Sequence, residues 1–279
     1  MIRLGARRSQ RLAVVLVWGA AVATLLVLLL IIAYILVEGL PRVSLEFLLG
    51  SPRQMGRQGG ILPMIVGTFA LTVVAVLIAT PFGVGTAIYL TEYTREGRLT
   101  RLIRFGTESL AGVPSIIFGL FGFVFFVITL GMGWSILSGG LTLAAMILPT
   151  IIRTSEEAIR SVPTVYRDVS FALGATRWQT VTRAVLPTAL PGITTGVILG
   201  VGRSVGETAA VILTAGSALQ MPTSLFSPTR TMAVHFYILA REGVSLEMAY
   251  ATGAVLVILV LAINVLANEA LRRVMAKDR

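Results

Sequence analysis

Long stretches without a single charged residue constrain this chain more than any other feature of its sequence. The longest extends from Ser109 to Ile152, which is 44 residues without Asp, Glu, Lys or Arg. A helix needs about 20 apolar residues to cross the hydrocarbon core of a bilayer. We therefore expect two membrane-spanning helices here, joined by a turn within residues 131–140. Only 13% of the chain is charged, against about 25% in soluble domains, which supports a membrane protein.

Four further apolar stretches bring the expected number of spans to six. The first, Leu12–Val37, would be about 39 Å long as a helix at 1.5 Å per residue. It is too long for the apolar core of a signal peptide, so we expect it to be retained. The others are residues 58–91, in which Pro81 predicts a kink, 188–217 and 248–268.

The polar segments between the spans are expected at the membrane surfaces. Residues 38–60 and 218–247 are typical of exposed loops, and the single histidine, His235, is expected on the surface. Residues 92–108 carry arginines at near-helical spacing between apolar residues, which predicts a basic amphipathic helix lying on the lipid. Six spans put 17 Lys and Arg residues on the side of the chain ends and 5 on the other, so both ends are expected in the cytoplasm.

The composition excludes several kinds of chemistry. The chain has no cysteine and one histidine, which argues against disulfides, thiolate metal sites and histidine clusters. Its only lysine, Lys277, is followed by Asp278, so the ATP-binding Walker A motif is absent and any ATP must bind to another chain. The net charge of +10 does not indicate nucleic-acid binding, because most arginines flank apolar runs. We expect no cofactor or metal bound by this chain.

Residues 162–187 form a charged segment between two spans and predict two short helices. Pro163 suits a helix start and Gly174 a helix end, while Thr176 and Gln179 have the spacing of a capping box. We expect the second helix to stop at Leu186-Pro187. Such a hairpin could contact a soluble partner, or it could be an interfacial helix that only packs on headgroups. Spacing alone leaves both interpretations open.

Arg203 and Glu207 are the only charges expected deep within a span. Four residues apart on a helix, they share a face and can pair. Because charges in a membrane are costly, we interpret them as lining the path of an anion, with a structural ion pair as the alternative. Ser204 is a further candidate for this path. Gly192, Gly196 and Gly200 place three glycines on one face, where another helix could approach closely.

Ser115 is a weaker candidate for the same path. It follows Gly112-Val113-Pro114, and a proline near a helix start could leave free N–H groups aimed at an anion. More often such a Pro-Ser pair only begins or kinks a helix.

The charged segment resembles the cytoplasmic loop of ABC importer permeases. The family pattern is Glu-Ala-Ala, three residues, Gly, nine residues, Ile, one residue and Leu-Pro. Here it takes the form Asp168-Val169-Ser170, Gly174, Ala184 and Leu186-Pro187, so the glycine and Leu-Pro keep the family spacing. Flanking stretches are similar to the permeases of phosphate-specific importers, the PstA subunit family in particular. They are residues 111–115, 173–176 and 202–208.

This resemblance implies an all-α integral membrane protein with six transmembrane helices and the type I ABC importer permease (MetI-like) fold. Residues 1–60 would hold the N-terminal tail, first helix and periplasmic loop, and residues 61–279 the permease domain, with a coupling loop at 153–187. Arg203 and Glu207 match positions implicated in phosphate transport in that family. The residues expected to contact the ATPase are Asp168, Ser170, Ala172, Leu173, Gly174, Ala175, Leu186 and Pro187.

The partners implied by the resemblance are a second, homologous permease subunit, a dimer of ATP-binding subunits that holds ATP and Mg²⁺, and an extracytoplasmic phosphate-binding protein. The expected location is the bacterial inner membrane. The cargo could instead be molybdate, sulfate or an organic solute. An ion-driven secondary transporter is less favoured because no internal repeat is visible, and an intramembrane enzyme because no histidine lies in an expected span.

Overall fold

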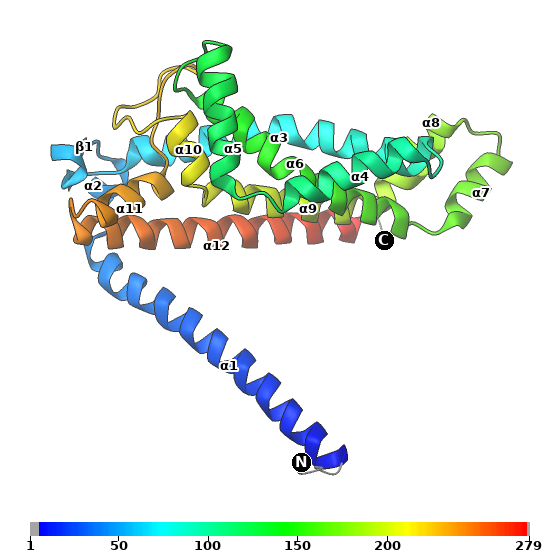
Figure 1. Cartoon of the computed structure of the whole chain (residues 1–279), viewed down its shortest axis with the longest axis horizontal. Coiled ribbons are helices and arrows are strands. Elements are labelled where there is room, and N and C mark those ends of the chain that lie inside the picture. The colour runs from blue at the N-terminus through cyan, green and yellow to red at the C-terminus, as the bar shows by residue number, and fades with distance from the viewer. Residues whose placement is uncertain (1–5, 278–279) are drawn as a thin grey trace.

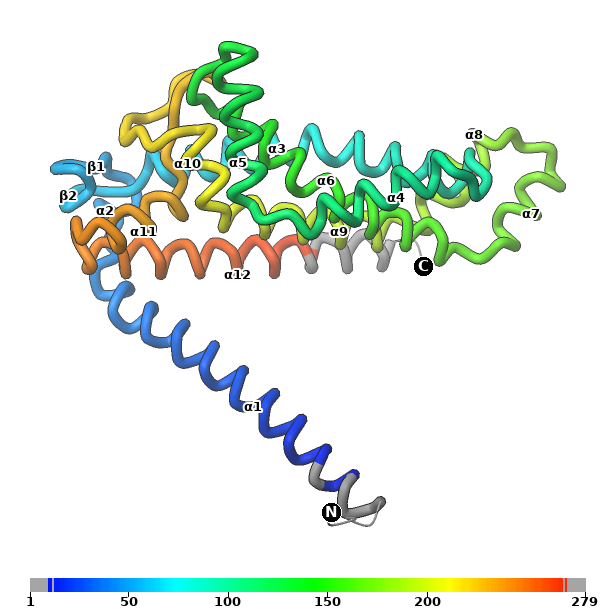
Figure 2. The backbone as a smooth tube through the Cα atoms, viewed as in Figure 1, coloured from blue at the N-terminus to red at the C-terminus, as the bar shows by residue number. Residues whose placement is uncertain are grey.

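Long helices lying side by side form the body of the molecule (Figures 1 and 2). They are α3 (Leu62–Ile88), α6 (Ile136–Ser161), α9 (Leu186–Val205) and α12 (Leu246–Lys277). This computed structural model describes residues 6–277, except for the side chains of several residues near the two ends of that range. Within that range, five helical stretches are long and apolar enough to cross a membrane, or six if one bent pair counts as a span. The chain is an all-α membrane protein, as the sequence predicts.

Helix α1 (Ala6–Gly39) diverges from this body along most of its length (Figure 1). It touches α12 only near its C-terminal end, where the rings of Tyr34 and Tyr250 pack edge to face with centroids 5.6 Å apart. The apolar side chains of its spanning stretch are exposed on all sides. Such a helix requires lipid or another membrane helix around it.

The bent pair consists of α4 (Arg98–Ala111) and α5 (Ser115–Gly122), which continues as the π-helix η4 (Phe123–Thr129). The helix axis bends by 104° between the two arms, because Pro114 disfavours the helical conformation of the residue before it. The expected surface helix of residues 92–108 is therefore wrong in its placement. Helix α4 instead runs along the bundle beside α6, where Arg104 Nε donates to Glu156 Oε1 at 2.8 Å.

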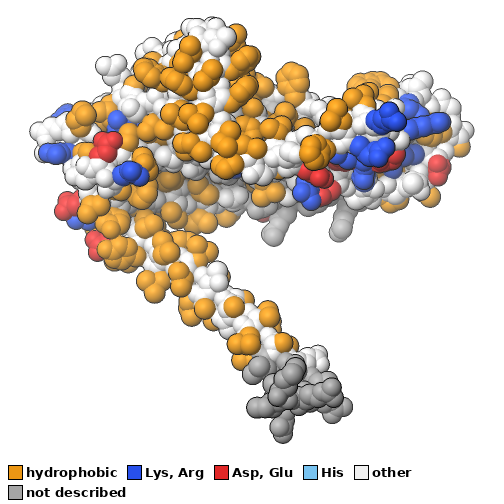
Figure 3. Space-filling model, viewed as in Figure 1, with side chains coloured by type: hydrophobic (Ala, Val, Ile, Leu, Met, Phe, Trp, Pro, Cys, Tyr) orange, Lys and Arg blue, Asp and Glu red, His pale blue; other side chains and the backbone are white. Residues whose placement is uncertain are grey.

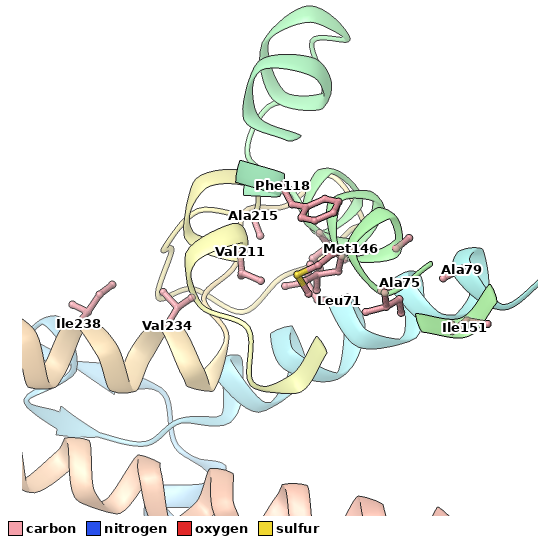
Figure 4. Close-up of a cluster of buried hydrophobic side chains, with 14 residues drawn as sticks. Leu71, Ala75, Ala79, Phe118, Met146, Ile151, Val211, Ala215, Val234 and Ile238 are labelled. Atoms are coloured by element: carbon pink, nitrogen blue, oxygen red, sulfur yellow. The ribbon is translucent and has the colours of Figure 1, made fainter. Parts of the chain in front are cut away.

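The main buried cluster combines side chains of α3, α5 and α6 with those of α10 (Ala209–Thr214) and α11 (Met232–Arg241) (Figure 4). Helix α6 also packs closely against α3 and α9. Glycines make this contact possible: a Cβ added to Gly83 of α3 would lie 2.7 Å from Ile151 Cγ2. Likewise, a Cβ at Gly192 of α9 would lie 2.5 Å from Ala158 Cβ, and one at Gly196 would collide with Thr154. The predicted glycine face on residues 192–200 is confirmed.

One end of the bundle, which we call the cap end, contains small elements where the sequence predicts exposed loops. They are η1 (Leu40–Arg42), α2 (Leu45–Leu49), β1 (Pro52–Arg53), η2 (Gln54–Gly56), β2 (Gln58–Gly59) and α11 (Met232–Arg241). Strands β1 and β2 pair antiparallel. Phe47 and Met232 are buried in one cluster with Met64. The loop prediction is wrong here because isolated apolar residues in polar segments give no periodic signal.

His235 is buried at the cap end, contrary to the expected surface position. Its side chain is 1% exposed and lies under Gly56, whose φ of +95° favours glycine. Arg230, itself 6% exposed, has Nη1 3.3 Å from His235 Nδ1. Burial, assisted by the Arg230 charge, lowers the pKa of His235 to about 4. The imidazole is therefore neutral in the folded chain.

The prediction that both ends are cytoplasmic rests largely on basic residues outside the described part of the structure. Arg3 and Arg279 lie outside the described residues. The side chains of Arg7, Arg8, Arg272, Arg273 and Lys277 are likewise not described.

We predict that acid destabilises the fold through His235. The unfolded histidine takes up a proton below its ordinary pKa of 6.5, whereas the folded one resists protonation until about pH 4. The free energy of unfolding should therefore fall by about 3 kcal/mol as pH drops from 6.5 to 4. Thermal unfolding in detergent measures this, with His235→Gln as the comparison. An identical pH dependence in both proteins would contradict the prediction.

Candidate functional site

The end of the bundle opposite the cap carries a projecting helical hairpin (Figure 1). It is formed by α7 (Thr164–Ala172) and α8 (Arg177–Thr180). Pro163 caps α7, and Gly174 adopts a φ of +80° in the connecting turn. The predicted capping box is present: Gln179 N donates to Thr176 Oγ1, and Thr176 N donates to Gln179 Oε1 at 2.9 Å. We call these residues, 163–180, the α7–α8 hairpin.

The expected stop at Leu186-Pro187 is wrong. Helix α8 continues through the π-helix η5 (Val181–Val185) into α9, so residues 177–205 form one helix. Pro187 lies in the first turn of α9, where its missing N–H is tolerated. The wider turn of η5 joins the two helices, with Leu186 N donating to Val181 O. The hairpin is thus attached directly to a membrane-spanning helix.

The α7–α8 hairpin presents apolar side chains to its surroundings. No residue of α7 is buried, and Leu173 at the turn is 84% exposed. Arginines gather at this end of the molecule on the face shown in Figure 3. The other exposed large apolar residues of the hairpin are Val165, Tyr166, Val169, Phe171 and Trp178. An exposed apolar surface of this kind marks a contact with another protein or a membrane.

Most residues predicted to contact an ATPase lie on this hairpin. Ser170 bonds across it to Thr180, with their hydroxyl oxygens 2.8 Å apart. Leu186 and Pro187 lie instead at the start of α9, away from the turn, where Leu186 packs against a buried cluster. The exposed predicted residues are Asp168, Ala172, Leu173, Gly174 and Pro187, and Ala175 is half-buried.

Arg203 and Glu207 do not form the predicted ion pair in the part of the chain that the structure describes. Helix α9 ends at Val205, so the backbone leaves the helical path before Glu207 and the i,i+4 geometry is lost. Glu207 Oε1 instead accepts from Ala210 N at 3.2 Å and caps α10 (Ala209–Thr214). Arg203 lies in the last turn of α9, where a cation is favoured by the helix dipole.

The remaining candidates lie close to this break. Ser204 is 3% exposed, and its hydroxyl has no hydrogen-bond partner among the described residues. Ser115 begins α5, which packs along α10: a Cβ on Gly119 would lie 2.8 Å from Ala210 Cα, and one on Gly122 would lie 2.9 Å from Thr214 Cγ2. Because Ser115 lies four residues before Gly119 and Ala209 only one residue before Ala210, α5 begins about one turn ahead of α10. Ser115 and Glu207 therefore lie near the starts of two helices that pack together.

An apolar groove of about 610 Å³ lies between α3, α9 and α12. Val201 and Val205 line it from α9, and Leu259 lines it from α12. Arg203 is two positions from each valine, so it lies on the opposite side of α9. Most of its wall comes from α3. Movement of α3 would therefore change the shape of this groove.

Sequence reasoning missed an ion pair between Glu92 and Arg167, whose Oε1 and Nη2 atoms are 2.6 Å apart. Arg167 directly precedes the predicted contact Asp168, but nothing in the sequence indicates a partner 75 residues away. The pentapeptide Gly202-Arg203-Ser204-Val205-Gly206 has the letters of the Gly-x-Ser-x-Gly nucleophile elbow. It lies at the end of a helix and lacks the strand–turn–helix context of that elbow.

Comparison with known proteins finds a matching protein family and several relatives of this chain. Residues 79–276 match the family described as binding-protein-dependent transport system inner membrane component. Over 266 residues the chain is 36% identical to the probable ABC transporter permease protein YqgI of Bacillus subtilis, covering 90% of both chains. It is 32% identical over 238 residues to the phosphate transport system permease protein PstA of Pasteurella multocida, covering 84% of each.

Two solved structures show the same fold. The chain matches a bacterial alginate ABC transporter with a TM-score of 0.69 at 16% identity, covering 95% of this chain and 97% of that one. The inward-facing MetNI methionine ABC transporter gives 0.66 at 22% identity, covering 77% and 95%. The predicted type I permease (MetI-like) fold is confirmed.

Proposed function

Because this chain belongs to the family of binding-protein-dependent transport system inner membrane components and is a membrane permease subunit of an ABC importer, we propose that its cargo is phosphate. The observation that carries this proposal is the likeness to PstA along most of the chain, 32% identity over 84% of both proteins. The division into residues 1–60 and a permease domain at 61–279 remains a prediction.

The pathway that we propose passes the junction of α5, α9 and α10. The N-terminus of α5, which begins at Ser115, offers N–H groups and partial positive charge to an anion. Arg203 adds a full charge with several donors, which suits phosphate oxygens. The hydroxyl of Ser204, to which no described residue is hydrogen-bonded, is a further available group. Glu207, already committed to capping α10, limits how tightly the anion is held.

The proposed partners follow from the two ends of the molecule. The apolar α7–α8 hairpin would dock on an ATP-hydrolysing subunit, which holds ATP and Mg²⁺, and the cap end would face an extracytoplasmic phosphate-binding protein. The exposed apolar surfaces of α1 and of the α5–η4 arm suit a homologous second permease and membrane lipid. This assigns the hairpin and both chain ends to the cytoplasmic side of a bacterial inner membrane.

In the proposed mechanism this chain performs no covalent chemistry. Closure of the ATPase pair on ATP moves the α7–α8 hairpin, which is continuous with α6 through residues 162–163 and with α9 through η5. A rigid-body push on the hairpin then shifts the spans that surround Arg203 and changes which side of the membrane the pathway opens to.

Phosphate uptake into vesicles tests the assignment. The chain is reconstituted with its candidate permease and ATPase partners and the binding protein, with and without ATP. We expect uptake only with ATP and the full set of subunits, and competition by unlabelled phosphate but not by molybdate or sulfate. Competition by those oxyanions instead would reassign the cargo, and uptake by this chain alone on an ion gradient would overturn the proposal.

We predict that Arg203→Gln lowers phosphate uptake by roughly 10- to 100-fold, because a hydrogen bond to a charged group contributes about 1.5–3 kcal/mol. Arg203→Lys keeps the charge and should retain part of the uptake. Copurification of the subunits measures assembly in parallel. Loss of assembly in Arg203→Gln, with uptake per assembled complex unchanged, would show a structural role only.

We predict that Gly174→Val weakens the stimulation of ATPase activity by this chain. A side chain in the left-handed region costs about 1–2 kcal/mol, more when it is β-branched, although open space surrounds Gly174. Gly174→Asn is the matched control, because asparagine tolerates this conformation and should preserve most of the stimulation. Equal stimulation by all three proteins would count against the hairpin as the ATPase contact.

A further inference from the structure

The α7–α8 hairpin is connected in different ways to α3, α6 and α9. It is covalently continuous with α6 at one end and with α9 at the other. Helix α3, which supplies most of the groove wall, has no such connection to it. A push on the hairpin therefore moves α6 and α9 through the chain itself, and can reach α3 only through packing or through side-chain bonds.

One arginine on the hairpin supplies such bonds. Arg167 of α7 contacts Glu92 with two nitrogens: Nη2 lies 2.6 Å from Oε1, and Nε lies 3.1 Å from Oε1 and 3.3 Å from Oε2. Glu92 belongs to the π-helix η3 (Tyr89–Tyr93), which directly continues α3. The same guanidinium donates to Val162 O at 2.8 Å and Ile159 O at 3.0 Å, at the end of α6. A single side chain thus joins α7 to the ends of both α3 and α6.

The other arm of the hairpin contacts the same segment. Arg177 of α8 lies over the ring of Tyr93, with its guanidinium carbon 5.8 Å from the ring centroid. Helices α7 and α8 therefore both hold η3, one by an ion pair and one by a cation–π contact. The rest of α7 has no buried residue that would lock it to the bundle.

The bond between Arg167 and Glu92 is shielded from water. Only 19% of the Arg167 side chain and 9% of the Glu92 side chain are exposed. The nearby pair of Arg153 and Glu157 is 68% and 67% exposed. Salt screens the exposed pair strongly and the shielded one far less. Because Arg167 contacts Glu92 through two nitrogens, the contact also fixes how the two side chains are oriented, which a mechanical link between helices requires.

We propose that the Arg167–Glu92 ion pair is a tether that makes α3 follow the coupling hairpin, so that ATP-driven movement reaches the groove between α3, α9 and α12. The tether rests on the proposed coupling function of the hairpin and adds positioning residues that the family motif pattern does not contain. Without it, the hairpin would still move α6 and α9, while α3 would lag behind.

The test uses the assembled complex in vesicles and measures transport per ATP hydrolysed. Arg167→Gln and Glu92→Gln should each lower this ratio by about 10-fold while ATP hydrolysis and assembly persist. The charge swap Glu92→Arg with Arg167→Glu should recover part of the ratio, because the ionic attraction is restored but the bonds to the Ile159 and Val162 carbonyls are not. Arg98→Gln is the matched control: Arg98 is exposed and has no ion pair among the described residues.

A second readout does not depend on the cargo. The chain has no cysteine, so spin labels can be placed at two exposed residues alone, Tyr89 of η3 and Thr164 at the start of α7. In the otherwise natural chain, the distance between the labels should stay nearly constant when ATP binds to the complex. In Arg167→Gln it should change and broaden. This result would support the tether even if phosphate proves to be the wrong cargo.

Two results would overturn the tether. One is an unchanged ratio of transport to hydrolysis, with an unchanged label distance, in both single variants. The other is loss of assembly in both single variants with no recovery in the charge swap, which would show that the pair serves folding only.

Discussion

The close approach of α6 to α3 on one side and α9 on the other is the constraint on which the rest of the structure depends. Gly83 on α3 and the glycine face of α9 remove the side chains that would hold these helices apart. Without a hydrophobic driving force between helices in lipid, such contact supplies the packing energy that holds a bundle together. The hairpin, the groove and the junction near Arg203 are all attached to these three helices.

The charged side chains of this bundle lie where burying them costs least free energy. The middle is nearly free of ionisable groups, and ion pairs gather at the hairpin end, where Arg104, Glu156, Glu92 and Arg167 link segments distant in sequence. Ionic contacts there can be strong and directional, because they are partly shielded yet close to water. The same region has to bear the force of a partner. The specific bonds at this end therefore suit the transmission of movement from a partner. The apolar packing in the middle allows the helices to shift against one another.

Local sequence features predicted the hairpin well because their structural effects are local. Pro163, Gly174 and Thr176 each act through their own backbone or through residues a few positions away. The same reasoning was wrong at Leu186-Pro187, where a π-helical turn carried the helix past the proline. It was also wrong for Arg203 and Glu207, because a helical spacing predicts a shared face only while the helix continues.

By itself, the sequence determined the membrane class, the approximate spans, the caps of the hairpin and the glycine face of α9, since hydrophobicity and backbone preference act over a few residues. Only the tertiary structure decided that α4 and α5 form a bent pair, that His235 is buried against Arg230, and that Glu92 meets Arg167 across 75 residues of chain. Those contacts depend on which segments the packed bundle brings together, and no periodicity or spacing along the chain encodes that.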